Sequence, residues 1–186
     1  MKTPLIGFAG AARSGKDTAA SFLVEYGWQR KAFADPVRDM LYALNPDLRD
    51  PSEFLGVADL AERVDTYGWE KAKQVHPEVR RYLQRLGTEA GRKVLGADVW
   101  VNALFRDYKE WDTPVVITDV RFPNEAEAIR DRGGLVVNIL RPSQAPIAAA
   151  DHISENALVG YDFDVTVLNS GTLEGLRASV LAVAQN

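Results

Sequence analysis

The sequence predicts an α/β fold in which a five-stranded parallel sheet lies between layers of helices. Three observations predict it. Short apolar runs alternate with segments of helical periodicity along most of the 186-residue chain. A glycine-rich loop follows the first apolar run, and a longer helical stretch interrupts the alternation. Strands that alternate with helices form parallel sheets, because each crossover helix returns the chain to the same edge of the sheet.

Five short segments are expected to form the strands, and four helices follow or connect them. The expected strands cover residues 5–9, 28–34, 115–119, 135–140 and 163–168. The expected helices cover residues 17–26, 36 to about 44, 123 to about 132, and 172–184. Pro36 and Pro123 suit the first position of a helix, where no backbone N–H is needed. The pair Gly133-Gly134 is typical of a helix end.

The remaining segments predict an insertion and a lid. Residues 52–108 have a helical pattern, with breaks expected near Gly68, Pro77, Gly87 and Gly96. We interpret residues 1–186 as a single domain with a helical, substrate-binding insertion over about 46–110. Residues 141–160 are loop-like, and we expect them to form a lid that closes over the site and excludes water.

Composition excludes several classes of function. The chain has no cysteine and only two histidines, which excludes disulfides, thiolate catalysis and a multi-histidine metal site. A net charge of −4 argues against binding to polymeric nucleic acid. No apolar run approaches the roughly 20 residues that cross a bilayer, and the N-terminal apolar run is too short for a signal peptide. We therefore expect a cytoplasmic protein without membrane partners.

The glycine-rich loop carries the strongest functional signal. It fits the pattern G-x-x-x-x-G-K and reads Gly10-Ala11-Ala12-Arg13-Ser14-Gly15-Lys16-Asp17-Thr18. Glycines permit a tight turn whose N–H groups point at phosphate oxygens, and the helix that follows adds its positive end. Lys16 supplies a mobile charge for the β- and γ-phosphates. Asp17 stands where Ser or Thr is usual, so either Asp17 through water or the Thr18 hydroxyl could serve Mg²⁺.

The loop resembles the P-loop of bacteriophage deoxynucleoside monophosphate kinases. The resemblance continues, in order along nearly the whole chain, through Phe33-Ala34-Asp35-Pro36, Leu86-Gly87-Thr88-Glu89 with Arg92, Asp98-Val99-Trp100, Thr118-Asp119-Val120-Arg121-Phe122-Pro123-Asn124-Glu125 and His152-Ile153-Ser154-Glu155. It implies the three-layer P-loop NTPase fold of nucleoside monophosphate kinases. It also implies ATP as phosphoryl donor, with Mg²⁺.

Two residues at the end of the 115–119 run and just after it are candidates for catalysis. Asp119 ends a predicted strand, the place where ligands bind in open α/β sheets, and could orient Mg²⁺ through water. The alternative is that Asp119 caps the helix that begins at Pro123. Arg121 could neutralise the transferring or acceptor phosphate, and its alternative is a surface ion pair.

The acceptor would lie near the end of the second strand. In related kinases an aspartate in the position of Asp35 faces the phosphoryl acceptor, and Arg38, one turn further, could hold the phosphate of the acceptor. The alternative for Asp35-Pro36 is a helix cap followed by proline at the first helical position.

The helical insertion supplies further candidates. Arg81, Arg85, Thr88 and Arg92 would share one stripe of a continuous α-helix, and the resemblance favours Thr88 and Arg92 as substrate contacts. Gln84 could contact a base edge. Trp100 could stack on a base or crowd the 2′ position of the sugar, or it could pack in the core.

The lid and the last loop complete the predicted site. Arg141 follows a strand and could reach the transferring group. His152 is either a substrate contact or a structural hydrogen-bonding residue. The donor adenine passes Asn169 in related kinases, and the alternative for that segment is an ordinary turn with a helix cap.

The resemblance implies transfer of the γ-phosphoryl group of ATP to a deoxynucleoside monophosphate, giving a diphosphate and ADP. The expected catalytic residues are Lys16, Asp35, Asp119 and Arg121. The acceptor phosphate is already ionised, so no strong general base is required. Two alternatives stay open: a kinase resembling dephospho-coenzyme A kinase, with Asp35 as base, and a nucleotide-binding regulatory switch. The oligomeric state is open as well, and a homodimer is one outcome.

Overall fold

The computed structural model describes residues 4–49, 56–142 and 157–185. The chain forms two compact units, each with its own hydrophobic core. The sheet unit comprises Met1–Phe33 and Phe105–Asn186, and the helical unit comprises Ala34–Leu104. The helical unit overlaps the insertion expected over residues 46–110, whose place within one domain stays a prediction.

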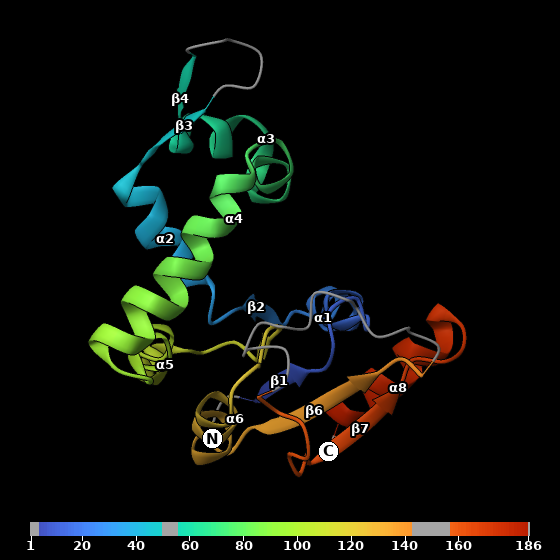
Figure 1. The fold of residues 1–186 in the computed structure, drawn as a ribbon. Coiled ribbons are helices and arrows are strands. Elements are labelled where there is room, and N and C mark those ends of the chain that lie inside the picture. The colour runs from blue at the N-terminus through green and yellow to red at the C-terminus, as the bar shows by residue number, and fades with distance from the viewer. Residues whose placement is uncertain (1–3, 50–55, 143–156, 186) are drawn as a thin grey trace. The chain divides into compact units, whose positions relative to one another are not determined.

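The sheet unit contains five parallel strands in the order β2–β5–β1–β6–β7 (Figure 1). They are β1 (Leu5–Ala9), β2 (Gln29–Lys31), β5 (Val115–Ile117), β6 (Leu135–Leu140) and β7 (Val165–Leu168). The predicted α/β fold class is confirmed, and β1 and β6 have the predicted bounds. Apolar runs form the inner strands because both faces of a parallel sheet are covered.

Helices cover both faces of this sheet. On one face, α1 (Lys16–Glu25) and α8 (Leu173–Ala184) bury Phe22 and Val180 against side chains such as Ile6 and Phe8 of β1. On the other face lies α6 (Pro123–Asp131). A Cβ atom on Gly7 would lie 2.4 Å from Ile129 Cδ1 of α6, so only glycine lets the helix approach β1 this closely. A short 3₁₀ helix, η2 (Tyr108–Glu110), follows the return of the chain to this unit.

The helical unit contains most of the remaining elements. In order they are α2 (Asp35–Leu44), the antiparallel pair β3 (Asp47–Arg49) and β4 (Val57–Asp59), α3 (Leu60–Val75), α4 (Pro77–Gln84), the π-helix η1 (Arg85–Leu95) and α5 (Val99–Leu104). Its core is built around Leu41, Leu48, Leu60 and Val79. Within the described ranges, none of the helices is long and apolar enough to cross a membrane.

The structure corrects two details of the expected helical segment and confirms two others. Residues 57–59 form a strand, so the first helix after the hairpin begins at Leu60; Ser52, where the helical pattern begins, lies outside the described residues. The predicted breaks at Gly68 and Pro77 are confirmed, since Gly68 has φ 79° within α3 and Pro77 begins α4. The break predicted at Gly87 is wrong, because helix η1 continues through it and ends at Gly96 with φ 110°.

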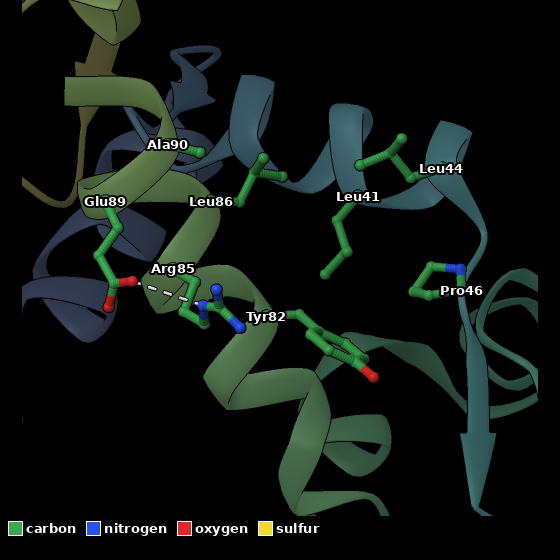
Figure 2. Close-up of a pocket in the computed structure, with 8 residues that line it drawn as sticks. All are labelled: Leu41, Leu44, Pro46, Tyr82, Arg85, Leu86, Glu89 and Ala90. Carbon is green, nitrogen blue, oxygen red and sulfur yellow. Dashed lines mark ion pairs between the residues drawn. The ribbon is translucent and has the colours of Figure 1, made fainter. Parts of the chain in front are cut away.

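A cavity of about 580 Å³ lies within the helical unit between α2 and the continuous helix α4–η1 (Figure 2). Its lining is largely apolar and includes Leu41, Leu44 and Leu86. Arg85 stands at its edge and pairs with Glu89, with Nε and Oε2 3.4 Å apart. None of the residues predicted to bind substrate lines this cavity.

The two points where the chain leaves and re-enters the sheet unit are buried and in contact. Phe33 is the last residue before the helical unit and Phe105 the first after it. Both are buried, and their rings meet edge to face with centroids 6.0 Å apart. Arg132 covers the outer face of this pair, with its guanidinium 4.0 Å from the Phe105 ring centroid. This cluster fixes both crossings to the sheet unit.

The amino-terminal edge of the sheet is held by an ion pair between α6 and the segment before β7. Arg130 donates from Nε to Asp164 Oδ2 over 3.1 Å, and the Val136 N–H donates to the same oxygen over 2.7 Å. Burial of Asp164 opposes its ionisation, but the hydrogen bonds from Arg130 and Val136 outweigh burial and hold the pKa of Asp164 below its ordinary value. The charged form of Asp164 therefore stabilises the fold.

We predict that Asp164→Asn lowers the free energy of unfolding at pH 7 by about 1 kcal/mol, a value discounted for partial exposure. Because the pKa of Asp164 is lowered in the folded protein, the charged carboxylate adds to the free energy of unfolding. This contribution is complete above the ordinary aspartate pKa of about 3.9 and is lost as the pH falls through the folded-state pKa. Urea unfolding measured at a series of pH values should therefore show that the free energies of unfolding of the parent and of Asp164→Asn converge at acid pH. Asp131→Asn, at an exposed position of α6, is the control. A difference that stays constant down to acid pH would contradict the prediction.

Candidate functional site

The loop after β1 has a backbone that only glycine can follow at two points. Gly10 has φ 133° and Gly15 has φ 104°. A Cβ atom on Gly10 would lie 2.4 Å from the carbonyl oxygen of Ile139, and one on Gly15 would lie 2.5 Å from Asn169 Nδ2. Arg13 also adopts a left-handed conformation, with φ 63°. The result is a tight concave turn that leads directly into α1.

Lys16 concentrates positive charge at this turn. It is the first residue of α1, and its Nζ donates to the carbonyl oxygens of Gly10 and Ala11, each over 2.7 Å. The ammonium group is thereby held across the loop, next to the N-terminal N–H groups of the helix. Positive charge and a helix N-terminus together favour an anion.

Asn169, which follows β7, holds the loop through hydrogen bonds. Its Nδ2 donates to the carbonyl oxygen of Ser14 over 2.8 Å, and its own N–H donates to Leu140 O over 2.7 Å. Ser14 is buried, and its Oγ has no hydrogen-bond partner among the described residues. Buried polar atoms are usually satisfied, so the loop retains polar capacity that a ligand could use.

A cavity of about 430 Å³ opens at this loop. Seven of the nine residues predicted to bind ATP line it: Arg13, Gly15, Lys16, Asp17, Thr18, Arg141 and Asn169. Ala12 and Ser14 do not line it. Leu173 and Leu176 of α8 also line it and were not predicted, although the helical pattern of residues 172–184 placed them on the helix after the Asn169 turn. Thr172 caps that helix by accepting from Gly175 N over 3.2 Å.

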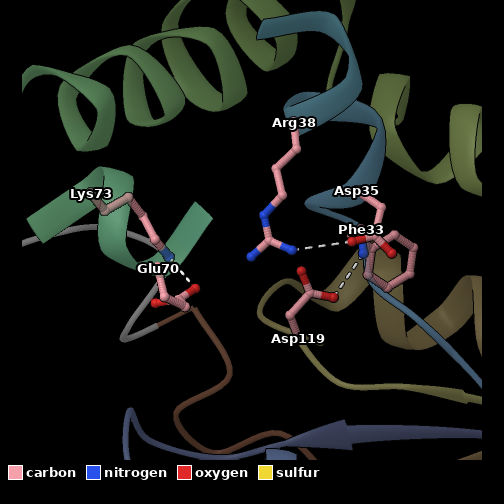
Figure 3. Close-up of polar contacts among 6 residues, drawn as sticks. All are labelled: Phe33, Asp35, Arg38, Glu70, Lys73 and Asp119. Atoms are coloured by element: carbon pink, nitrogen blue, oxygen red, sulfur yellow. Dashed lines mark hydrogen bonds and ion pairs between the residues drawn. The ribbon is translucent and has the colours of Figure 1, made fainter. Parts of the chain in front are cut away.

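Asp119 is fixed by a main-chain contact with the end of the second strand. Its Oδ1 accepts from the Phe33 N–H over 2.7 Å, as Figure 3 shows. The alternative role as a helix cap is not formed, because Phe122 occupies the cap position of α6. Ile117 pairs with Gly7 and with Lys31 in the parallel register, so Asp119 leaves the sheet at the same edge as the glycine-rich loop.

A buried carboxylate that the sequence analysis did not select lies just beyond Asp119. Glu125 is 3% exposed, and its Oε2 accepts from the N–H groups of Arg121 over 2.7 Å and Phe122 over 3.1 Å. The side chain of Arg121 itself is exposed. Proline at the first helical position with glutamate two residues later is the signal that could have identified Glu125 as a capping residue.

Asp35 and Arg38 form an ion pair within the helical unit. Arg38 Nη1 lies 3.3 Å from Asp35 Oδ1 (Figure 3). Asp35 is already helical and Ala34 precedes it, so the helix-cap alternative for Asp35 is not formed. A hydrogen bond from Lys73 holds the pKa of Glu70 below its ordinary value; burial opposes this, and Lys73, Arg38 and Arg80 add positive charge.

The predicted stripe on the insertion divides into two classes. Arg81 and Arg85 are exposed, whereas Thr88 and Arg92 are half-buried; Gln84, predicted separately from the stripe, is exposed. A π-helix takes more residues per turn than an α-helix, so η1 shifts Thr88 and Arg92 out of line with the earlier residues. Arg92 Nη1 donates to Ala97 O over 2.9 Å, which closes the end of the helix.

Trp100 packs inside the helical unit. It is 4% exposed, and its Nε1 donates to Gly87 O over 2.7 Å. A Cβ atom on Gly91 would lie 2.5 Å from the indole ring, so the ring packs closely against Gly91. Packing is the role that this geometry gives Trp100, and its contact with a base or sugar stays a prediction.

Two further predictions concern residues with less structural information. His152 and most of the expected lid, residues 143–156, lie outside the described residues. In the described part of the chain, no group of three or more acidic or histidine side chains gathers at one point to hold a metal ion. The donor set around the loop offers carboxylate and hydroxyl oxygens, which suit Mg²⁺ when phosphate and water supply the other ligands.

We predict that Gly10→Ala lowers the free energy of unfolding by at least roughly 2 kcal/mol and abolishes binding of an ATP analogue. The new Cβ would meet the main-chain oxygen of Ile139, which cannot move aside without disturbing β6. Thermal unfolding and fluorescence titration measure the two effects. Gly175→Ala is the matched control, since its ideal Cβ would meet only Thr172 Oγ1 at an ordinary 3.7 Å and Gly175 does not line the cavity. A Gly10→Ala protein that melts and binds like the parent would contradict the prediction.

Comparisons with known proteins identify relatives of the chain. Residues 55–180 match the model of the deoxynucleotide monophosphate kinase family. A protein of Acanthamoeba polyphaga mimivirus that is named as a deoxynucleotide monophosphate kinase is 31% identical, over 98% of this chain and 96% of that protein. The deoxynucleoside-5'-monophosphate kinase of Escherichia phage T5 is 28% identical, over 83% of this chain and 84% of that enzyme.

Among solved structures, the dephospho-CoA kinase from Campylobacter jejuni aligns over 100% of this chain and 97% of that chain. Its identity is 13% and its TM-score 0.47, a likeness that does not bear on the acceptor. The family match, by contrast, covers more than half of the sequence and includes the Asp119–Glu125 segment. The chain therefore belongs to the deoxynucleotide monophosphate kinase family.

Proposed function

We propose that this protein transfers the γ-phosphoryl group of ATP to a deoxynucleoside monophosphate, giving the diphosphate and ADP. The observation that carries the proposal is the cavity at the glycine-rich loop, which seven predicted ATP-binding residues line in a chain of this family. The loop has the features that a phosphate chain requires: concave backbone, a lysine and a helix N-terminus.

In this proposal the donor lies along the loop. The N–H groups of residues 12–18 bind the phosphates, and Lys16 turns from the loop carbonyls toward the β- and γ-phosphates. Arg141 lies beside the transferring group. Asn169 holds the loop in shape, and Leu173 and Leu176 offer apolar surface to the adenine from α8.

Mg²⁺ fits the same arrangement. Asp119 would hold it, partly through water, with Asp17 or the Thr18 hydroxyl as a further oxygen ligand. Its chemistry there is to neutralise charge on the β- and γ-phosphate oxygens. The choice between Asp17 and Thr18 stays open, since both line the cavity.

Residues of the helical unit are proposed to bind the acceptor. Arg38 holds the acceptor phosphate, and Asp35 orients Arg38 through their ion pair. Thr88 and Arg92 contact the nucleoside. The remaining proposed contacts are Gln84, Trp100 and His152.

The proposed reaction requires charge neutralisation more than proton transfer. An oxygen of the acceptor monophosphate forms a bond to the γ-phosphorus, the bond to the β–γ bridging oxygen breaks, and ADP leaves with that oxygen. The attacking oxygen is already ionised at neutral pH, so no residue must remove a proton. Lys16 and Arg121 stabilise the charge that spreads over the transferring group.

The relatives are viral, which supports the cytoplasm of an infected host as the place of action. A homodimer stays a prediction.

We predict that Lys16→Ala lowers turnover more than about 100-fold, because a preorganised charge at the transferring group is lost. The assay combines ATP, Mg²⁺ and each common deoxy- or ribonucleoside monophosphate and separates the products by chromatography. Lys109→Ala, an exposed lysine of η2, is the control and should retain activity. Retained turnover in Lys16→Ala would contradict the prediction. Parallel reactions with dephospho-coenzyme A, and with no acceptor, distinguish the two alternative functions.

We predict that Arg92→Ala raises KM for the deoxynucleoside monophosphate by on the order of 10-fold to 100-fold, the loss expected for a charged hydrogen bond. KM for ATP should stay within about twofold. Arg85→Ala is the matched control on the same helix, because Arg85 pairs with Glu89 instead. Steady-state kinetics with each substrate varied in turn measure both constants. Equal changes in the two variants would argue against a specific role for Arg92.

A further inference from the structure

Every residue of the segment 118–122 forms a hydrogen bond with another part of the sheet unit. The N–H of Thr118 donates to Lys31 O, and the N–H of Val120 donates to Phe8 O, each over 3.1 Å. Asp119 accepts from the Phe33 N–H. The N–H groups of Arg121 and Phe122 both donate to Glu125 Oε2. The first three contacts belong to the ends of neighbouring strands, whereas the last two depend on a single side chain.

One of the two bonds to Glu125 has no role in capping the helix. Phe122 is the cap residue of α6, so the bond from its N–H is the one that a capping glutamate makes. Arg121 lies one residue outside the helix, and its N–H is not among the groups that helix formation leaves unsatisfied. This outer bond is nevertheless the shorter one, at 2.7 Å against 3.1 Å.

We propose that Glu125 is a positioning residue for Arg121. It fixes the backbone from which the Arg121 side chain reaches the transferring or acceptor phosphate. This inference rests on the proposed function, because it assigns Glu125 a part in the same reaction. Glu125 itself does not touch substrate.

The chemistry of Glu125 suits this task. The carboxylate is 3% exposed, so water competes little for its oxygens. Bonds from N–H groups to a charged oxygen are shorter and stronger than those to a neutral one. The N–H of Val120 and the N–H of Arg121 are both hydrogen-bonded, to Phe8 O and to Glu125 Oε2, so these two bonds help to set the backbone direction at Arg121. A small change in that direction would displace the guanidinium group by much more than the backbone itself.

The test compares Glu125→Gln and Glu125→Asp with Asp164→Asn. Glutamine keeps the length but not the charge, and aspartate keeps the charge but is one methylene shorter. Asp164→Asn also removes a carboxylate that accepts a main-chain N–H, that of Val136, but at the amino-terminal edge of the sheet. All rates are expressed per ATP-binding site, measured by titration, so that loss of folded protein does not lower kcat.

We expect both Glu125 variants to lose on the order of 10-fold to 100-fold in kcat, as misplaced catalytic groups do, with KM for ATP within about twofold. Asp164→Asn should keep the kcat of the parent, even if its Tm falls by as much as the Tm of the Glu125 variants. In an Arg121→Lys background, Glu125→Gln should cost less than about threefold further, because the two residues act as one unit.

Three results would overturn the inference: unchanged kcat in both Glu125 variants, an equal fold-loss of kcat with and without Arg121, or loss of ATP binding in both variants, which would make Glu125 purely structural. Failure of the proposed function is recognised separately, since the parent protein would then phosphorylate no deoxynucleoside monophosphate.

Discussion

The parallel register between β1 and β5 is the constraint on which the site depends. Gly7 pairs with Ile117, so both strands end at the same edge of the sheet. The chain leaves β1 into the glycine-rich loop and leaves β5 into the Asp119 turn. β2 and β6 join the same register through Lys31 and Val136, and they bring Phe33 and Arg141 to that edge. The proposed phosphate site thereby draws on four segments distant in sequence, with no need for a long loop to fold back.

The sequence predicted the elements whose signal is local. Buried strands such as 135–140 are continuous apolar runs, and the glycine-rich loop is one contiguous motif. The hairpin β3–β4 was missed because strands of three residues are too short to show periodicity. Gly87 and Gly91 are alike in sequence, and what distinguishes them is the Trp100 ring packed against Gly91. That contact joins η1 to α5 and has no local signature.

The candidate site divides in the same way. The P-loop residues were predictable because spacing and chemistry coincide in one stretch. The cap alternatives for Asp35 and Asp119 could not be excluded without structure, because each aspartate lies shortly before a proline that suits the start of a helix. The structure excludes the cap role for both and gives their partners: Arg38 for Asp35, and the Phe33 N–H, 86 residues away in sequence, for Asp119. Glu125 escaped notice because capping explains its presence, and only its second bond indicates more.

The contact between Phe33 and Phe105 has a consequence for how this architecture tolerates change. The segment 34–104 departs and returns at two residues whose ring centroids lie 6.0 Å apart. Both endpoints are anchored to the sheet unit, so the sheet does not depend on how many residues connect them. Insertions between close, fixed ends add little loop-closure entropy. The segment proposed to bind the acceptor can therefore change in length without altering the strands that carry the glycine-rich loop.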